Sequence, residues 1–300
     1  MMRFYLIILF FSLAISSYSG FDSKKAYDSI LEQCSFGPRY PGSEGHEKYK
    51  DYLFNELSKY SKDVLIDEHL IKDPLTADSV KIYNIFARIN PKLNKRVLFM
   101  AHWDTRRFAD KDPNPLNHDK PVLGANDGAS GVAVLLGIID QLEKKKLNNL
   151  GVDFLFTDAE DMGTYGSTDT WAIGSRLFSQ SYPQNLPLFG ICVDMVADKD
   201  LKIKMERNSY QMAPELMNHV WNIASMMGYG EFFVWDMGPS IIDDHISFSM
   251  ETKIPSINII DMDYKYWHTI NDIPDNTSQY SLHVVGSVLS EFIYNMDTYE

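Results

Sequence analysis

Residues 151–163 read GVDFLFTDAEDMG, and the fold can be worked outward from this stretch. It begins with a nearly continuous apolar run, which is typical of a strand buried on both faces of a sheet. The run gives way to Asp158, Glu160 and Asp161, followed by Gly163. Carboxylates crowded at the end of a hydrophobic strand repel one another and are costly to desolvate. The cluster indicates a cation site or a proton-transfer site, unless it is a loop whose acids simply face water.

The composition limits the classes of protein to be considered. The chain has 300 residues, of which 45% are hydrophobic and 13% aromatic, enough for one large domain or two small ones. The formal net charge is −13, and no run of basic residues stands out. Phosphate neutralisation requires clustered Lys and Arg, so we expect no nucleic-acid partner.

Residues 1–19 have the pattern of a signal peptide. Arg3 precedes an apolar run at residues 4–15, and small residues precede Gly20. The run is short for a membrane span, although an uncleaved anchor is the alternative. We expect an exported protein, periplasmic or secreted, whose mature domain covers residues 20–300 and has no stable membrane association.

Only two cysteines occur, Cys34 and Cys192. Export would permit a disulfide, but Cys192 lies inside an apolar run and has the character of a core residue. Spacing alone does not decide the pairing, and we expect two free thiols.

Hydrophobic periodicity predicts strands that alternate with helices. The opening stretch is one strand, and the other expected strands cover residues 64–71, 80–89, 95–101, 187–193, 231–235 and 254–260. The expected helices lie within residues 22–60, interrupted by a Gly- and Pro-rich loop at 34–46, and at 128–142, 167–179, 214–227 and 278–296. This order predicts an α/β protein, a single-domain three-layer α/β/α sandwich around a central mixed, mostly parallel sheet.

Polar side chains gather at or just after the C-terminal ends of the expected core strands. They are His102, Asp104, Asp161, Asp194 and His268, and Asp127 stands at the start of a helix. This edge of an α/β sheet is where ligands bind, and histidines with carboxylates suit zinc when thiolates are absent. Each residue has a plainer explanation as a cap or a loop side chain, but the coincidence at five strand ends favours a metal site.

Together these motifs resemble the zinc-aminopeptidase superfamily. The resemblance rests on the residues above and on the segments FGPRYPGS at 36–43, NDGASG at 126–131, TDAED at 157–161 and His268-Thr269. It covers nearly all of the mature chain. It implies a single domain of the zinc-aminopeptidase type and a metal-dependent enzyme that acts at peptide N-termini.

Two branches of the superfamily imply different metal contents. In the dizinc aminopeptidases, the resemblance implies one ion on His102, Asp127 and Asp194, and a second on Asp127, Asp161 and His268. Glu160 would then activate a water. In the glutaminyl-peptide cyclotransferases, it implies one zinc on Asp127, Asp161 and His268, with Glu160 as general acid and base.

Three segments favour the cyclotransferase branch. Trp267 directly before His268 resembles the Trp-His-Thr sequence of the cyclases, and DDHISF at residues 243–248 resembles their Asp-Asp-His segment. Residues 164–175 resemble the corresponding segment of bacterial cyclases. Asp161 is one methylene shorter than the Glu that is frequent there, and the retention of His102 and Asp194 also permits a second ion.

The expected reaction closes an N-terminal Gln into pyroglutamate with release of ammonia. A Lewis acid on the γ-carbonyl oxygen and one carboxylate that moves a proton are sufficient, because no water nucleophile is needed. We expect Glu160 to move the proton and to share it with Asp194 or Asp243. Trp171 and Trp267 would wall the pocket. The expected partners are peptides and proteins with an N-terminal Gln, and one zinc ion is expected, or two if the enzyme is an aminopeptidase.

Overall fold

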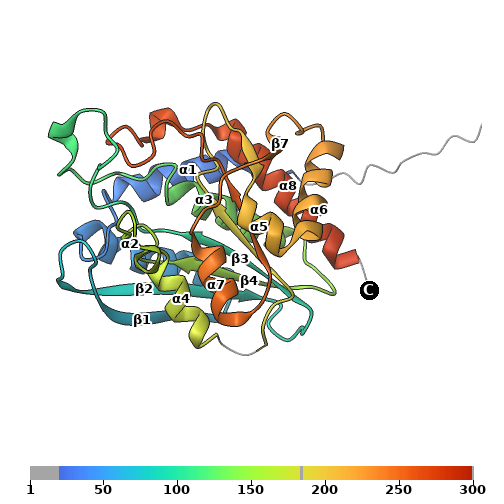
Figure 1. Ribbon diagram of the computed structural model, residues 1–300. Coiled ribbons are helices and arrows are strands. Elements are labelled where there is room, and N and C mark those ends of the chain that lie inside the picture. The colour runs from blue at the N-terminus through green and yellow to red at the C-terminus, as the bar shows by residue number, and fades with distance from the viewer. Residues whose placement is uncertain (1–19, 183–184, 299–300) are drawn as a thin grey trace, which may run out of the picture.

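The main sheet has six strands in the order β1-β2-β4-β3-β5-β8 (Figure 1). The structure, a computed structural model, describes residues 20–182 and 185–298, so the expected signal peptide lies outside the described residues. The strands are β1 (Val64–Lys72), β2 (Ser79–Ile89), β3 (Arg96–His102), β4 (Gly151–Thr157), β5 (Gly190–Asp194) and β8 (Ser256–Ile260). Strands β4, β3, β5 and β8 are parallel, whereas β1 and β2 extend the sheet in antiparallel fashion.

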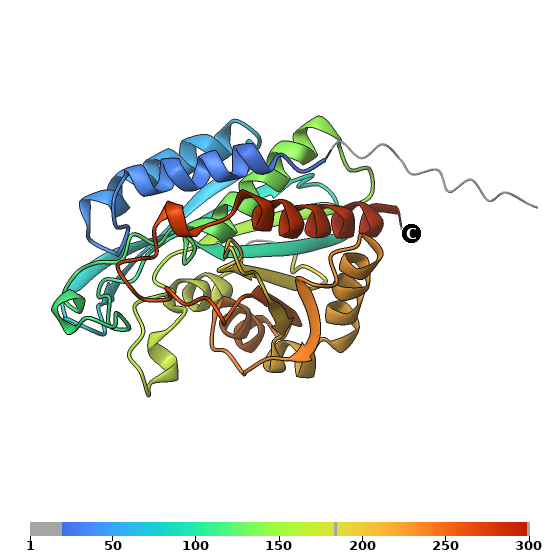
Figure 2. The same cartoon turned by 90° about the horizontal axis from the view of Figure 1, so that it is seen from above.

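Helices cover both faces of this sheet (Figure 2). One face carries α1 (Ser23–Ser35), α2 (Glu44–Ser58), α3 (Ala129–Lys144) and α8 (Gln279–Thr298), and the other carries α4 (Ile173–Gln180) and α7 (Asp244–Thr252). A small parallel pair, β6 (Ile203–Met205) and β7 (Phe233–Met237), accompanies α5 (Arg207–Met212) and α6 (Pro214–Met226). The predicted three-layer α/β/α sandwich with a mixed, mostly parallel sheet is therefore confirmed.

The alternation of side chains along β3 explains the two apolar layers. Val97, Phe99 and Ala101 belong to the large core beneath α1, α3 and α8. Leu98 and Met100 point to the opposite face and pack in the smaller core beneath α4 and α7. Because both faces are covered, the strand is apolar at every position between Arg96 and His102, and polar side chains are confined to its two ends.

The prediction of one helix at residues 167–179 is wrong. A 3₁₀ turn at Thr168–Thr170 is followed by Ala172, whose φ of 49° is left-handed, and α4 begins only at Ile173. The break turns the Trp171 side chain away from the helix and towards the cavity described below. The short elements β6 and α5 were not predicted, because segments of this length carry no readable periodicity.

Both cysteines are free thiols, as expected. Within residues 20–182 and 185–298, no helix combines the length and the apolar character that a membrane span requires.

Candidate metal centre

Four side chains from separate elements meet around the carboxylate of Asp127. His102 ends β3, Asp194 ends β5, Asp161 follows β4, and His268 lies in the loop after β8. Asp127 Oδ1 lies 3.2 Å from His102 Nε2, and Asp127 Oδ2 lies 3.5 Å from His268 Nε2. These four side chains and Asp127 are buried. The predicted convergence at the sheet edge is thus present, with Asp127 between two groups of potential ligands.

The first group is Asp127, Asp161 and His268. Both carboxylate oxygens of Asp161, and Oδ2 of Asp127, are buried and have no hydrogen-bond partner among the described residues. Asp161 Oδ1 is 2.9 Å from His268 Nε2, but the two atoms are not aligned for a hydrogen bond. Unpartnered buried carboxylate oxygens are costly unless a cation is shared between them. This group has the donor set and the spacing of a metal site.

The second group is His102, Asp194 and again Asp127. His102 Nε2 lies 3.0 Å from Asp194 Oδ1 in hydrogen-bonding geometry, while its Nδ1 lies 3.5 Å from Asp104 Oδ1 without a hydrogen bond. Burial raises the pKa of Asp194 to about 7, although the nearby His102 acts to lower it. The second group can hold a cation, but it can equally share a proton.

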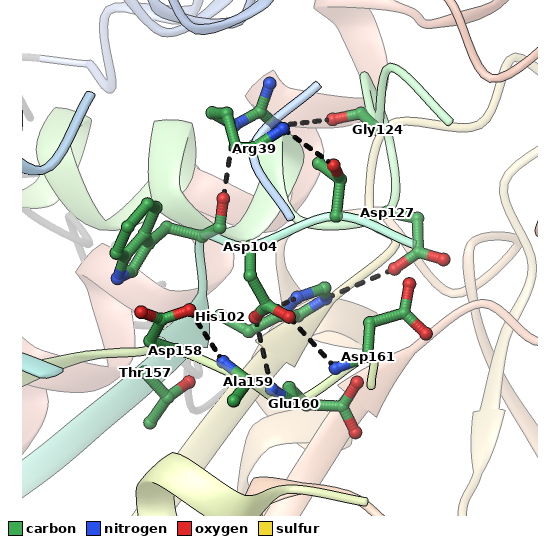
Figure 3. Close-up of polar contacts among 12 residues, drawn as sticks. Arg39, His102, Asp104, Gly124, Asp127, Thr157, Asp158, Ala159, Glu160 and Asp161 are labelled. Atoms are coloured by element: carbon green, nitrogen blue, oxygen red, sulfur yellow. Dashed lines mark hydrogen bonds and ion pairs between the residues drawn. The ribbon is translucent and has the colours of Figure 1, made fainter. Parts of the chain in front are cut away.

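The loop that carries Glu160 and Asp161 is fixed by Asp104. The Asp104 carboxylate accepts the backbone N–H groups of Glu160 and Asp161, each at 3.1 Å (Figure 3). Ala159, just before them, has a left-handed φ of 55°. This conformation is uncommon for a residue with a Cβ and persists where surrounding contacts over-determine it. Asp104 therefore positions the loop from outside both groups of potential ligands.

Asp158 belongs to a different network. Its Oδ2 accepts from Tyr83 N and lies 2.7 Å from His46 Nε2, while its Oδ1 accepts from Ala159 N. His46 in turn stacks on Trp103, which is fully buried. Of the three crowded acids in the opening stretch, Asp158 therefore faces the protein interior.

Asp127 is placed by its backbone. Asp272 accepts the N–H groups of Asn126 and Asp127 at 2.8 and 3.0 Å. The N-cap of α3 is Gly128, whose φ is 99°, and no side chain caps this helix. The alternative of Asp127 as an N-cap is therefore wrong, and its carboxylate is free for the cluster.

Arg39 ties together two segments that follow His102. This arginine comes from the loop between α1 and α2 and is fully buried. Its guanidinium donates to the carbonyl oxygens of Trp103 and Gly124, at 3.1 and 2.9 Å (Figure 3). The end of β3 and the loop that leads to Asp127 are therefore held by one side chain.

His268 is oriented from behind by two residues that the sequence did not indicate. Its Nδ1 lies 2.8 Å from Tyr165 Oη and 3.4 Å from Asp110 Oδ1. Burial opposes its protonation, but Asp161 and Asp110 outweigh burial and raise the pKa of His268 to about 9. The environment favours positive charge at this position. Outer partners of this kind hold a ligand histidine with its other nitrogen facing the metal.

Glu160 lines a small pocket together with the potential ligands. Asp243, Trp171 and Trp267 line the same pocket. Burial raises the pKa of Glu160 well above its usual range, and the nearby Asp243 carboxylate raises it further. A carboxyl group in this environment can hold a proton near neutral pH.

The two tryptophans form the walls around His268. Trp171 stacks on the imidazole with ring planes 11° apart, and the Trp267 ring centroid lies 4.1 Å from it. Trp171 also covers Gly163, where an added Cβ would lie 1.9 Å from the indole. A glycine is required there, because any side chain would displace Trp171.

Comparison with known proteins assigns the chain to a family. A sequence model described as Peptidase family M28 matches residues 84–293, which contain all of the potential ligands. The chain belongs to peptidase family M28. The family is zinc-dependent, in agreement with the buried donor set.

Several solved structures match almost the whole chain. The glutaminyl cyclase of Bacteroides thetaiotaomicron, bound to N-acetylhistamine, is 35% identical with a TM-score of 0.88, covering 92% of this chain and 98% of that one. The Tannerella forsythia glutaminyl cyclase is 36% identical with a TM-score of 0.88, and the coverage is 92% and 99%. A Zn-dependent exopeptidase from Parabacteroides distasonis is 34% identical with a TM-score of 0.89, covering 93% and 100%.

The separations within the first group of this M28 chain also fit zinc. Ligands of a tetrahedral zinc with bonds of about 2.0–2.1 Å lie roughly 3.3 Å apart. The distances of 2.9 and 3.5 Å from His268 Nε2 to the two carboxylates bracket this value. The residues present therefore fit the metal that the family uses.

Arg106 is a further residue of the site that sequence reasoning missed. It is buried, and its Nη1 donates to the carbonyl oxygens of Asp161 and Gly163 at 2.8 and 2.7 Å. Its Nη2 pairs with Asp110. Its position two residues after Asp104 was the only available signal, and that spacing does not reveal where the side chain points.

Proposed function

We propose that the protein is a zinc-dependent glutaminyl-peptide cyclotransferase, which converts an N-terminal Gln of peptides and proteins to pyroglutamate and releases ammonia. The observation that carries this proposal is the asymmetry around Asp127. The buried carboxylate oxygens without a hydrogen-bond partner belong to Asp161 and to the side of Asp127 that faces His268, whereas His102 Nε2 is hydrogen-bonded to Asp194. That pattern supports one metal position, and cyclisation needs no second metal to activate water.

Asp127, Asp161 and His268 would hold the zinc ion. When bound there, zinc supplies Lewis acidity to the γ-carbonyl oxygen of the substrate. Tyr165 and Asp110 keep the imidazole of His268 turned towards the ion. Arg106 and Asp104 fix the backbone on either side of Asp161.

Glu160 carries the proton. The α-amine nitrogen forms a bond to Cδ, the carbonyl carbon of the γ-carboxamide, and the bond from that carbon to the amide nitrogen breaks. Glu160 takes a proton from the attacking amine and gives one to the departing nitrogen, which leaves as ammonia. Asp243 and Asp194 line the same pocket and would share the proton with Glu160, and their negative field attracts the substrate ammonium.

Trp171 and Trp267 would hold the Gln side chain in a folded conformation. They flank the potential ligand His268 and line the pocket that contains Glu160. Restricting a short side chain between two rings brings the amine and the carbonyl carbon of the γ-carboxamide together and excludes water.

A dizinc aminopeptidase is the second candidate. It is supported by the placement of the two Asp127 oxygens, one towards His102 and the other towards His268, as a bridging carboxylate requires. The similar Parabacteroides structure is named a Zn-dependent exopeptidase. In that reaction Glu160 would activate a water instead of transferring a proton between nitrogens.

Incubation of Gln-leading and Leu-leading peptides with the purified protein tests the choice. Cyclisation releases ammonia and lowers the peptide mass by one ammonia, without a free amino acid. Release of free Leu would overturn the cyclotransferase in favour of the aminopeptidase. Zinc content per chain, measured on the same preparation, gives a second criterion: one ion supports the cyclotransferase and two support the alternative.

We further propose that residues 1–19 form a cleaved signal peptide and that residues 20–300 are one exported domain. The pattern of Arg3, an apolar run and small residues before Gly20 supports this. N-terminal sequencing of the protein recovered from its native cell envelope or medium would give Gly20 as the first residue. An intact Met1 in that material would contradict cleavage.

A further inference from the structure

The pocket opens onto an apolar shelf beside the active site. Its lining is shared in part with the pocket: Trp171, Ile241, Ile242, Met262 and Trp267 line both. Tyr165 and residues 166–168 extend it outward, and Tyr165 is 49% exposed. A peptide whose first residue occupies the pocket therefore continues across this shelf.

Lys111 stands over the outer end of the shelf. Its Nζ lies 3.9 Å from the centroid of the Tyr165 ring and 5.9 Å from that of Trp267. The residue is exposed, and within the described chain no carboxylate lies in ion-pair range of its ammonium group. The neighbouring acids are engaged elsewhere: Asp110 pairs with Arg106, and Asp112 accepts from Asn117.

The position of Lys111 is fixed by the site itself. Its backbone N–H donates to the carbonyl oxygen of His268 at 3.2 Å. The Tyr165 ring beneath it is held by the hydrogen bond between its hydroxyl group and the imidazole of His268. A cation is thus anchored to the potential ligand histidine, at the rim of a pocket whose interior carries five carboxyl groups.

We propose that the shelf and Lys111 form a substrate subsite that selects peptides with an acidic side chain at the second or third position. The inference rests on the proposed function and adds the substrate class. The apolar rings contact the aliphatic part of the peptide, and the ammonium group of Lys111 pairs with the carboxylate. The carboxyl groups inside the pocket would repel an acidic peptide. The ammonium group of Lys111 at the rim would instead attract the peptide carboxylate at the point where the peptide leaves the pocket.

Matched peptides that carry Glu or Gln at the second position, and a second pair that differs at the third, test the subsite. For the unaltered protein at low salt we expect kcat/KM to favour Glu at one of these positions by about 2- to 5-fold, the range of an exposed ion pair. The preference should shrink in high salt, because exposed pairs are screened.

Lys111→Gln should abolish the preference, and Lys111→Glu should reverse it towards Lys-containing peptides. Lys120→Gln is the matched control, since Lys120 lies in the same loop and bonds Asn117 instead of facing the shelf. Equal rates for Glu and Gln peptides in the unaltered protein, or a preference that survives Lys111→Gln, would overturn the subsite.

Binding separates the failure of this inference from the failure of the proposed function. Calorimetric affinity of the Glu160→Gln protein for the same peptides does not depend on turnover. Absence of cyclisation with every Gln peptide contradicts the cyclotransferase. A preference for Glu peptides in binding, lost in the additional Lys111→Gln variant, would still support the subsite, and equal affinities would refute it.

Discussion

The two sides of Asp127 are built from the same kinds of residue but differ in how their polar atoms are hydrogen-bonded. On one side, His268 Nε2 and Asp161 Oδ1 lie 2.9 Å apart without a hydrogen bond, and both oxygens of Asp161 lack a hydrogen-bond partner among the described residues, although Arg106 Nη1 lies 3.8 Å from Oδ1. On the other, His102 and Asp194 form a hydrogen bond of 3.0 Å. Burial makes the first arrangement unfavourable without a cation, while a shared proton is enough for the second. A histidine and two carboxylates therefore do not by themselves indicate how many metal ions are bound.

The largest expected effect comes from the side with the unpartnered oxygens. His268→Ala should remove zinc and reduce kcat/KM by about 10³-fold or more, because Lewis-acid stabilisation contributes several kcal/mol. Chelation of the unaltered protein should have the same effect, and added zinc should reverse it. Metal analysis together with the rate of ammonia release measures both. Full activity of a protein shown to be free of zinc would mean that the side of Asp161 and His268 does not hold a catalytic metal.

Glu160→Gln separates the proton-transfer role from metal binding. The variant should keep its zinc and lose roughly 10²- to 10⁴-fold in kcat, the range for a positioned general acid and base. Asp158→Asn is a control, because Asp158 bonds His46 and the Ala159 backbone outside the pocket. A Glu160→Gln protein with undiminished turnover would exclude Glu160 from the mechanism.

The residues behind His268 should have an intermediate effect. Asp110→Asn and Tyr165→Phe each remove a partner of the imidazole and should weaken zinc binding by about 10- to 100-fold. Competition with a zinc-sensitive dye measures the affinity. Unchanged affinity in both variants would mean that packing by the tryptophans alone orients His268.

The smallest effect is expected from the hydrogen-bonded side. His102→Ala should keep one zinc and lose less than about tenfold in activity, at the low end for an outer partner of a metal site. Asp194, whose pKa burial raises to about 7, can take up a proton when His102 is removed. A loss as large as that of His268→Ala would show that both sides hold catalytic metal, as in an aminopeptidase.

The placement of the site could be predicted from sequence because parallel strands end at one edge of a sheet. His102, Asp161 and Asp194 follow apolar runs directly, so their convergence needs no knowledge of the loops. His268 was assigned to the same edge from its place after a core strand, although it stands eight residues after the end of β8, and the motif resemblance supported the assignment. The positions of these residues were therefore predicted from the ends of the expected strands together with the motifs.

The partners behind the site could not be predicted. Asp110, Tyr165 and Asp272 lie in loops without periodicity, and their contacts depend on how those loops fold back. Likewise, the break at Ala172 shortened a predicted helix to Ile173–Gln180 and accompanies the stacking of Trp171 on His268, a residue distant in the chain. Contacts between segments distant in the chain decided each of these positions.

Arg39 has a consequence for any attempt to shorten the chain. The match to the family begins at residue 84, yet Arg39 lies well before it and joins the loops that present His102 and Asp127. A fragment that starts at residue 84 would leave the carbonyl oxygens of Trp103 and Gly124 without this donor and would uncover the core beneath α1 and α2. The boundary of sequence similarity is therefore a poor guide to the smallest active fragment.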